Sequence, residues 1–272
     1  MKKIFALVIS LSLVFLLAAC GASKDGKGGK TTTLTVGATP VPHAEILEKA
    51  KPILAKQGVN LKIVKFQDYV TPNKALASGD IDANYFQTVP YLKVQEKKNH
   101  YDFKDVGNIH VEPIGIYSKK YKSLKQLPKG ATIIMSNSVS DEPRMLLLLQ
   151  KAGLIKLKNG GNINSRIDDI TSNPKHLKIE AKYDAAMLPK IYKNGEGDAL
   201  LINTNYALDA GLNPKKDAIA MENDKSPYAN AVVVRAKDQN NPAVKKLVKV
   251  LHSKEIQDFI NKKYKGAVVP VK

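Results

Sequence analysis

Arg144 is the charged residue whose position most suggests a ligand. It stands at the expected beginning of a helix whose next five residues, 145–149, are all apolar. A guanidinium beside the exposed backbone N–H groups of a helix N-terminus suits a carboxylate. Because only three of the 43 basic residues are arginines, an arginine here indicates that planar, bidentate geometry matters. An ordinary salt bridge to Asp141 is the alternative interpretation.

A cluster of aromatic residues is the second feature that could bind a ligand. The chain has no Trp and only 6 Phe, yet Tyr85 and Phe86 are adjacent, with Tyr69 and Tyr91 close in sequence. We expect a loop beside Pro90 whose rings line a pocket for an apolar or thioether side chain, since sulfur packs well against rings. A satellite hydrophobic cluster under a loop is the alternative.

Motifs for covalent or nucleotide chemistry are missing from the sequence. It has no G-x-S-x-G elbow, no G-x-x-x-x-G-K-S/T phosphate loop and no G-x-G-x-x-G fingerprint. We therefore expect neither catalytic residues nor a cofactor, although a surface-tethered enzyme of unknown chemistry is one alternative. A metal-binding lipoprotein is another, because His43, His110 and Glu112 could supply ligands if the fold brought them together.

The single cysteine, Cys20, ends the sequence L-A-A-C after an apolar run over residues 4–16 that two lysines precede. This order is typical of an export signal, and the run is shorter than the about 20 residues of a membrane-spanning helix. L-A-A-C resembles the lipobox of bacterial lipoproteins, in which the cysteine is lipidated. We predict a signal peptide over residues 1–19 and a lipid anchor at Cys20 on the extracytoplasmic face of the cell membrane.

Composition limits the partners of the mature chain. Residues 20–33 are Gly, Lys and small polar residues, which predicts a flexible linker. The formal net charge is +18, or +16 once Lys2 and Lys3 leave with the signal peptide. Lysines supply nearly all of the basic residues, whereas base readout and bidentate phosphate contacts favour arginine. Lysines scattered along amphipathic helices are typical of a solvated face near an anionic envelope. We expect no nucleic-acid partner.

Strand and helix patterns alternate after the linker. This alternation predicts an α/β fold with mixed, mostly parallel sheets, and a binding crevice outside the carboxyl ends of the strands, between two lobes. Pro52 should kink the first helix. The expected strands are residues 34–37, 61–66, 111–117, 131–135, 177–181, 199–202 and 232–234, and the expected helices are residues 42–57, 72–77, 142–152, 185–192 and the region from 242 onward.

Five blocks of sequence carry a resemblance that spans nearly the whole mature chain. In family order, these blocks resemble those of the NlpA/MetQ-like lipoproteins, the methionine-binding components of ABC importers. The blocks are V-G-A-T-P-V-P-H-A-E-I-L (36–47), D-Y-V-T-P-N-K-A-L (68–76), I-D-A-N-Y-F-Q-T-V-P-Y-L (81–92), I-N-T-N-Y-A (202–207) and S-P-Y-A-N (226–230).

The resemblance implies a two-lobed, periplasmic-binding-protein-like fold with a hinge. Lobe 1 would comprise residues 34–113 and 230–272, and lobe 2 residues 114–229. The protein would capture methionine, or a closely related amino acid, and dock on a membrane permease that works with an ATPase. A methionine-containing dipeptide or another amino acid is the alternative ligand.

The resemblance also implies roles for individual residues. The carboxylate of the ligand would bind to Arg144, and two asparagines would hydrogen-bond its backbone-type polar groups. The aromatic residues of the cluster would wall the side-chain pocket. The residues carried over in this way are Tyr69, Phe86, Tyr91, Arg144, Asn203 and Asn230.

Two positions depart from the family pattern, and we include both in the expected ligand site. Thr88 stands where the family usually has histidine, which leaves volume for a larger ligand or an ordered water. Asp141 replaces an asparagine near Arg144. A carboxylate there would attract an ammonium group and could compete for the arginine.

Overall fold

The computed structural model describes residues 31–223 and 227–271. The predicted signal peptide, the lipidation site Cys20 and most of the expected linker lie outside the described residues. Within the described part, no helix combines the length and the apolar character that crossing a membrane requires.

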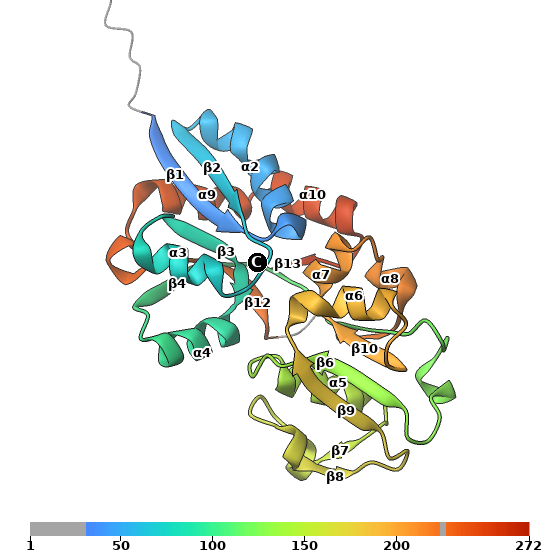
Figure 1. Ribbon diagram of the computed structural model, residues 1–272. Coiled ribbons are helices and arrows are strands. Elements are labelled where there is room, and N and C mark those ends of the chain that lie inside the picture. Colours follow the sequence, from blue (N-terminus) through green and yellow to red (C-terminus); the bar gives the residue numbers. More distant parts are fainter. Residues whose placement is uncertain (1–30, 224–226, 272) are drawn as a thin grey trace, which may run out of the picture. The chain divides into compact units, whose positions relative to one another are not determined.

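The first sheet has six strands and is covered by helices on both faces (Figure 1). One face packs against α2 (Glu45–Ala55), α9 (Pro242–Leu251) and α10 (Lys254–Tyr264), and the other against α3 (Thr71–Ser78) and α4 (Val89–Asn99). The strand order is β13 (Val269–Pro270), β4 (Phe103–Val111), β12 (Ala229–Arg235), β3 (Ala83–Thr88), β1 (Thr32–Ala38) and β2 (Val59–Lys65).

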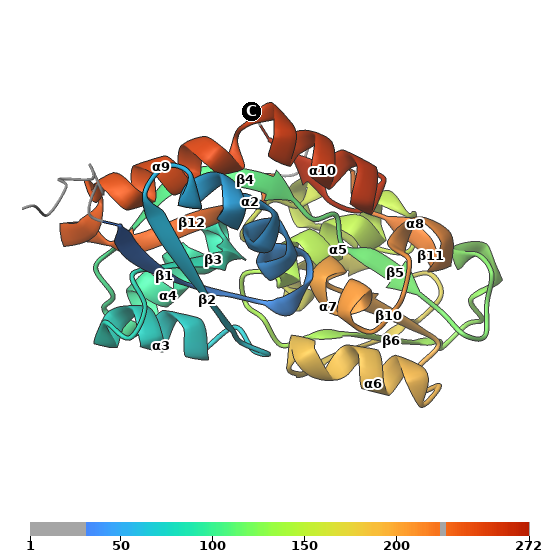
Figure 2. The same cartoon turned by 90° about the horizontal axis from the view of Figure 1, so that it is seen from above.

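The second sheet has five strands and lies beside α5 (Glu142–Lys151) on one face and α6 (Leu188–Lys193) with α7 (Thr204–Asp209) on the other (Figure 2). A short helix, α8 (Pro214–Asp217), precedes its edge strand. The strand order is β11 (Ala218–Met221), β5 (Gly115–Tyr117), β10 (Ala199–Ile202), β6 (Thr132–Ser136) and β9 (Lys178–Tyr183).

Short elements complete the part of the chain that the structure describes. A two-stranded ribbon pairs β7 (Lys156–Leu157) with β8 (Ile170–Ser172). The remaining helical turns are Pro40–Ala44, Leu124–Gln126, Lys158–Gly160, Ile167–Asp169, Ala185–Met187 and Ala236–Asp238.

Each sheet combines parallel and antiparallel neighbours, instead of being mostly parallel as expected. In the first sheet β1 is parallel to β2 and β3, but β12 runs against both β3 and β4. In the second sheet β6 is parallel to β9 and β10, but β5 runs against β10 and β11. Strands β4 and β12 run antiparallel because the chain leaves the first sheet at the end of β4, forms the second sheet, and returns at the beginning of β12.

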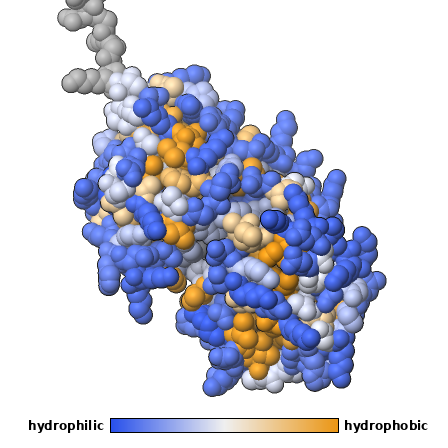
Figure 3. All heavy atoms as spheres, viewed as in Figure 1, coloured by the Kyte–Doolittle hydropathy of each residue, from blue (hydrophilic) through white to orange (hydrophobic). Residues whose placement is uncertain are grey.

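Alternation along the strands builds a core on each face of each sheet. In β12, Val232 and Val234 pack toward α2 and α9, whereas Ala231 and Val233 pack toward α3 and α4. Helix α9 presents Val244, Leu247 and Leu251 to the sheet, the spacing of an amphipathic helix. Hydrophilic side chains cover most of the face seen in Figure 3.

Several predicted boundaries were wrong, for local reasons. Thr32 and Thr33 do not belong to the linker, because they pair with Val59 and Asn60 as the first residues of β1. The strand expected over 111–117 is two strands, because the chain leaves one sheet after Val111 and enters the other at Gly115.

The first helix also begins later than predicted. A separate helical turn, Pro40–Ala44, precedes α2, because Val41 has extended backbone angles (φ −127°, ψ 134°) that interrupt a continuous helix. Helix α2 then runs through Pro52, an exposed position, to Ala55.

Candidate functional site

A cavity lies beyond the carboxyl ends of strands from both sheets. Most of its residues come from β3 and the first turn of α4, from the beginning of α5, and from Asn203 with the first turn of α7, and Tyr69, Glu112 and Asn230 complete the lining. The structure brings all eight residues expected to bind the ligand into this lining: Tyr69, Phe86, Thr88, Tyr91, Asp141, Arg144, Asn203 and Asn230.

Three aromatic rings form one wall of the cavity. The ring centroids of Tyr69, Phe86 and Tyr91 lie 5.9–6.1 Å apart, with tilted or edge-to-face geometry. The Tyr91 hydroxyl donates to the backbone carbonyl of Tyr69 at 2.8 Å, which fixes one ring against the other. The rings therefore offer an apolar, polarizable surface that suits a thioether.

The segment that carries these aromatics is a strand, and not the loop expected from the sequence. Residues Ala83–Thr88 form β3, paired with β1 on one side and β12 on the other. Alternation in the strand sends Phe86 toward the cavity and Tyr85 into the opposite core. This is why two adjacent aromatic residues have different roles.

Tyr69 also connects the two halves of the site. Its hydroxyl donates to Asn205 Oδ1 at 2.6 Å, and its ring lies 4.8 Å from the ring of Tyr206. Burial raises the pKa of Tyr69 well above its ordinary value, so the hydroxyl keeps its proton and remains a donor.

Thr88 caps a helix as well as lining the cavity. It is the N-cap residue of α4, and its hydroxyl accepts a hydrogen bond from the backbone N–H of Tyr91 at 3.4 Å. Thr88 therefore caps the helix, in addition to leaving more volume in the cavity than the histidine usual in the family.

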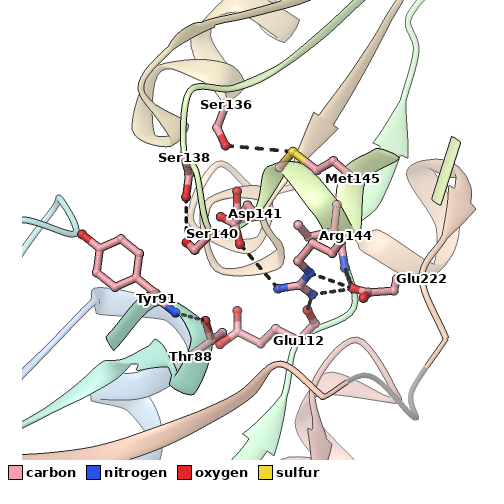
Figure 4. Close-up of polar contacts among 12 residues, drawn as sticks. Thr88, Tyr91, Glu112, Ser136, Ser138, Ser140, Asp141, Arg144, Met145 and Glu222 are labelled. Atoms are coloured by element: carbon pink, nitrogen blue, oxygen red, sulfur yellow. Dashed lines mark hydrogen bonds and ion pairs between the residues drawn. The ribbon is translucent and has the colours of Figure 1, made fainter. Parts of the chain in front are cut away.

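Arg144 is buried and already engaged on one side (Figure 4). Its Nε and Nη2 both donate to Glu222, and Nη2 also donates to the backbone carbonyl of Glu112 at 2.9 Å. The ring of Tyr228 stacks on the guanidinium at 4.3 Å. Burial lowers the pKa of Arg144, but the carboxylates of Glu222 and Asp141 outweigh it and raise the pKa above its ordinary value.

These contacts leave Nη1 as the guanidinium nitrogen available to a ligand. Among the described residues its nearest charged partner is Asp141, whose Oδ1 lies 3.8 Å away. The principal ion pair of Arg144 is therefore with Glu222, and the pair with Asp141 expected as the alternative is the longer one. A fully bidentate fork toward the ligand was expected, but Glu222 occupies half of that fork.

The two cavity asparagines are each oriented by a neighbour. Asn203 Nδ2 donates to Asp141 Oδ2 at 3.0 Å, and its Oδ1 is buried without a hydrogen-bond partner among the described residues. Asn230 Oδ1 lies 3.2 Å from His43 Nε2. Both side chains are therefore fixed on one end and available to the cavity on the other.

His43, His110 and Glu112, the candidate metal ligands, do come together behind the cavity. Glu112 Oε1 lies 3.2 Å from His43 Nε2 and 2.7 Å from His110 Nε2, and the three ligand atoms lie within 4.8 Å of one another. The other ring nitrogens face hydroxyls, with Thr39 at 2.7 Å from His43 Nδ1 and Tyr85 beside His110 Nδ1. These contacts link Thr39, His43, Glu112, His110 and Tyr85 in one buried hydrogen-bond network, which Asn230 joins at His43 Nε2.

Burial shifts the titration of this network. It lowers the pKa of His43 to about 4, although Glu112 opposes the shift, and it lowers the pKa of His110 to about 3. Burial raises the pKa of Glu112, against His43 and Arg144. Both imidazoles are therefore neutral near neutral pH, and each has one N–H donor and one acceptor nitrogen.

Sequence reasoning missed several residues of the site. Glu222, which holds Arg144, belongs to no motif and is 78 positions away. Glu112 was considered as a metal ligand and not as part of the cavity wall. Three further lining residues lie inside the sequence blocks that carry the family resemblance, but only their neighbours were predicted to bind the ligand. They are Gln87, Thr204 and Asn205.

Comparison with known proteins matches the chain to the family described as NlpA lipoprotein, over residues 34–272. The Methionine-binding lipoprotein MetQ of Bacillus subtilis (strain 168) is 48% identical over 275 residues, which covers 100% of this chain and 99% of that protein. The predicted family is thereby confirmed, and so is the expectation of a binding lipoprotein instead of an enzyme.

Solved structures agree in fold. A pheromone cOB1 precursor/lipoprotein of the YaeC family from Enterococcus faecalis V583 is 58% identical, with a TM-score of 0.86 over 88% of this chain and 100% of that one. A nutrient binding protein from Burkholderia cenocepacia, solved bound to methionine, is 48% identical, with a TM-score of 0.83 over 88% of this chain and 100% of that one. The predicted two-lobed α/β fold is confirmed.

Proposed function

Because the chain belongs to the NlpA lipoprotein family, we propose that it binds methionine in the cavity and delivers it to an ABC importer. The observation that carries the proposal is the cavity itself. Its lining combines an aromatic wall of three rings, a buried arginine and polar amides. A flexible, polarizable side chain suits the rings, and a carboxylate suits the guanidinium.

The relatives support the same ligand. The Bacillus subtilis relative is named for methionine binding, and the Burkholderia cenocepacia structure was solved with methionine. A methionine-containing dipeptide or another amino acid remains the alternative, because Thr88 and Asp141 differ from the family pattern.

We propose that binding closes lobe 1 (34–113 and 230–272) on lobe 2 (114–229) about a hinge. The contacts of Tyr69 with Asn205 and Tyr206 join residues of the two proposed lobes and would hold the closed state. The closed protein would then dock on a membrane permease that works with an ATPase. A lipid on Cys20 would keep it at the extracytoplasmic face of the membrane, close to that permease.

Mass spectrometry of the small molecules released from denatured, freshly purified protein tests the ligand. We expect methionine in amounts close to one molecule per chain. Release of a dipeptide would move the assignment within the same class. A second sample analysed for metals addresses His43, His110 and Glu112, and a stoichiometric metal without any amino acid would contradict the proposal.

A further inference from the structure

Helix α9 presents a row of lysines with no acidic residue in the same helix. Its apolar residues pack on the first sheet, which leaves Lys245, Lys246 and Lys249 exposed. The other described helices of similar length, α2, α4, α5 and α10, each contain at least one acidic residue. The positive charge of α9 is therefore not offset within the helix.

The hydrogen-bond partners of these lysines are neutral as well. Lys245 Nζ donates to Asn240 Oδ1 at 3.0 Å, and Lys246 Nζ donates to the backbone carbonyl of Gln57 at 2.7 Å. Neutral partners orient the ammonium groups and leave their charge in place. This side of α9 therefore attracts an anionic surface.

A groove beside α9 places apolar surface next to the charges. The half-buried side chains of Val106 and Val248 line it together with Lys245 and Lys249. Charge beside apolar surface suits a lipid, which has a charged headgroup and an apolar body, better than it suits a small soluble anion.

The lysines lie at the end of the first sheet where the chain arrives from the predicted lipid anchor. The backbone N–H of Thr32, the first residue of β1, donates to the carbonyl of Gly58, and Lys246 contacts the neighbouring residue Gln57. Figure 2 shows that β1 and α9 both begin at the end of this sheet that is distant from the second sheet. Residues 21–31 span at most about 40 Å when extended, so a lipid on the preceding cysteine keeps this end near the bilayer.

The cavity lies at the opposite end of the same strands. Strands β1, β2 and β3 run parallel to one another, and the cavity is beyond the carboxyl end of β3. Contact with the membrane through α9 therefore leaves the cavity away from the bilayer, where a ligand can reach it.

We propose that the lysine face of α9, formed by Lys245, Lys246 and Lys249, rests on the anionic phospholipids of the bilayer and orients the anchored protein. The anchor alone does not set an orientation, because the reach of residues 21–31 exceeds the Debye length of about 8 Å at physiological ionic strength. The inference assumes the predicted lipid on Cys20. It does not depend on which ligand the cavity binds.

A fluorescent label on a single cysteine reports which part of the protein lies at the bilayer. Cys20 is the only cysteine of the sequence, and lipidation would block its thiol, so a maleimide dye would react only with an introduced cysteine. Gln239→Cys places the dye at the groove beside α9, and Asn164→Cys places it near β7, at the distant end of the molecule in Figure 1. Both positions are exposed.

The lipidated, labelled chains would be reconstituted in vesicles that carry a nitroxide quencher on some headgroups. In vesicles of equal parts phosphatidylglycerol and phosphatidylcholine, quenching should be several-fold stronger at position 239 than at position 164. The difference should disappear in vesicles of phosphatidylcholine alone, and also at about 1 M salt, where the Debye length is only about 3 Å. Equal quenching at both positions in the anionic vesicles, or a difference that persists without anionic lipid, would overturn the inference.

Two triple variants separate the lysine face from net charge. The variant Lys245→Gln/Lys246→Gln/Lys249→Gln should lose the additional quenching at position 239. The control Lys151→Gln/Lys156→Gln/Lys158→Gln removes the same charge from exposed positions around α5 and β7, and it should retain that quenching.

An equal loss in both triple variants would show that net charge acts without a preferred face, and unchanged quenching in the α9 variant would exclude its lysines. Melting temperatures show whether each variant is folded. If the α9 variant does not fold, the comparison of the two dye positions across lipid composition and salt, made with all lysines present, decides alone.

Discussion

At the scale of single residues, Arg144 shows how a binding charge is prepared before the ligand arrives. Its guanidinium is buried, yet Glu222, Tyr228 and the carbonyl of Glu112 surround it. These contacts offset the cost of removing the charge from water. They also fix the direction of Nη1, so the ligand meets a donor that is already oriented.

Removing this arginine should abolish most of the affinity. Arg144→Ala should weaken methionine binding at least about 100-fold, because the ligand carboxylate would stay buried without its partner. Arg144→Lys should also bind poorly, since one ammonium cannot serve Glu222, the Glu112 carbonyl and a ligand together. Isothermal titration calorimetry measures both losses.

Arg166→Ala is the matched control for Arg144, because this arginine lies half-exposed beside Glu142 at 3.6 Å and does not line the cavity. Its affinity for methionine should equal that of the wild type. Unchanged affinity in Arg144→Ala would reduce Arg144 to a structural ion pair with Glu222.

The buried histidines make stability depend on pH. Burial lowers the pKa of His43 to about 4 and that of His110 to about 3, against about 6.5 in the unfolded chain. Below pH 6.5 the unfolded state therefore binds protons that the native state does not. Stability is lost as the pH falls, by up to about 1.4 kcal/mol per pH unit for each histidine.

Urea unfolding between pH 7 and pH 5 measures this slope. Glu112 acts in the opposite sense, because burial raises its pKa, so the net slope should be smaller than that of two histidines. His110→Gln should flatten it further. Two results would contradict the conclusion that His43 and His110 are buried as neutral imidazoles. One is equal stability of the wild type at both pH values, and the other is an unchanged dependence of stability on pH in His110→Gln.

At the scale of elements, the junction between β3 and α4 places the aromatic wall. Strand β3 directs Phe86 into the cavity, Thr88 ends the strand and caps the helix, and Tyr91 follows in the first turn of α4. The cap thus holds two rings of the wall in register with each other.

The hydroxyl of Thr88 should therefore contribute to stability. Thr88→Val keeps the shape but removes the cap, and it should cost about 1 kcal/mol in the free energy of unfolding. Thr88→Ser keeps the hydroxyl, so its free energy of unfolding should stay within about a few tenths of a kcal/mol of the wild-type value. Urea unfolding of both variants separates the loss of the hydroxyl from the loss of the methyl group. Wild-type stability in Thr88→Val together with reduced stability in Thr88→Ser would show that the methyl group, and not the cap, stabilises the protein.

Local patterns in the sequence predicted much of this arrangement, but contacts distant in sequence stayed hidden. The apolar stripe after Arg144 and the adjacent aromatics Tyr85 and Phe86 were enough to indicate a ligand pocket. Nothing local indicated that Glu222 would reach Arg144, or that Asn84–Gln87 would be a strand. Strand identity in that segment depends on β1 and β12 as neighbours, and such pairing is not encoded in a short window.

At the scale of the whole molecule, the anchor and the charge act at the same surface. A lipid on Cys20 would hold the protein at the membrane. The formal net charge, +18 for the full sequence and +16 without Lys2 and Lys3 of the predicted signal peptide, would attract it to anionic lipids. The two contributions differ in salt dependence, because salt screens charges and leaves acyl chains unaffected.

Cys20→Ala should therefore release the protein from membranes. The substituted chain should appear in the soluble fraction after a wash at about 1 M salt, where the Debye length is only about 3 Å. Wild-type protein should remain with the membranes under the same wash. Persistent membrane association of Cys20→Ala after that wash would show that the anchor lies elsewhere.

The most direct test of methionine binding is a calorimetric titration of ligand-free protein with methionine in both stereoisomers. The protein must first be unfolded and refolded, since a co-purified ligand would hide the binding. We predict saturable binding of methionine at one site per chain. No heat with either stereoisomer, together with saturable binding of a divalent metal by the same refolded protein, would contradict the proposed function.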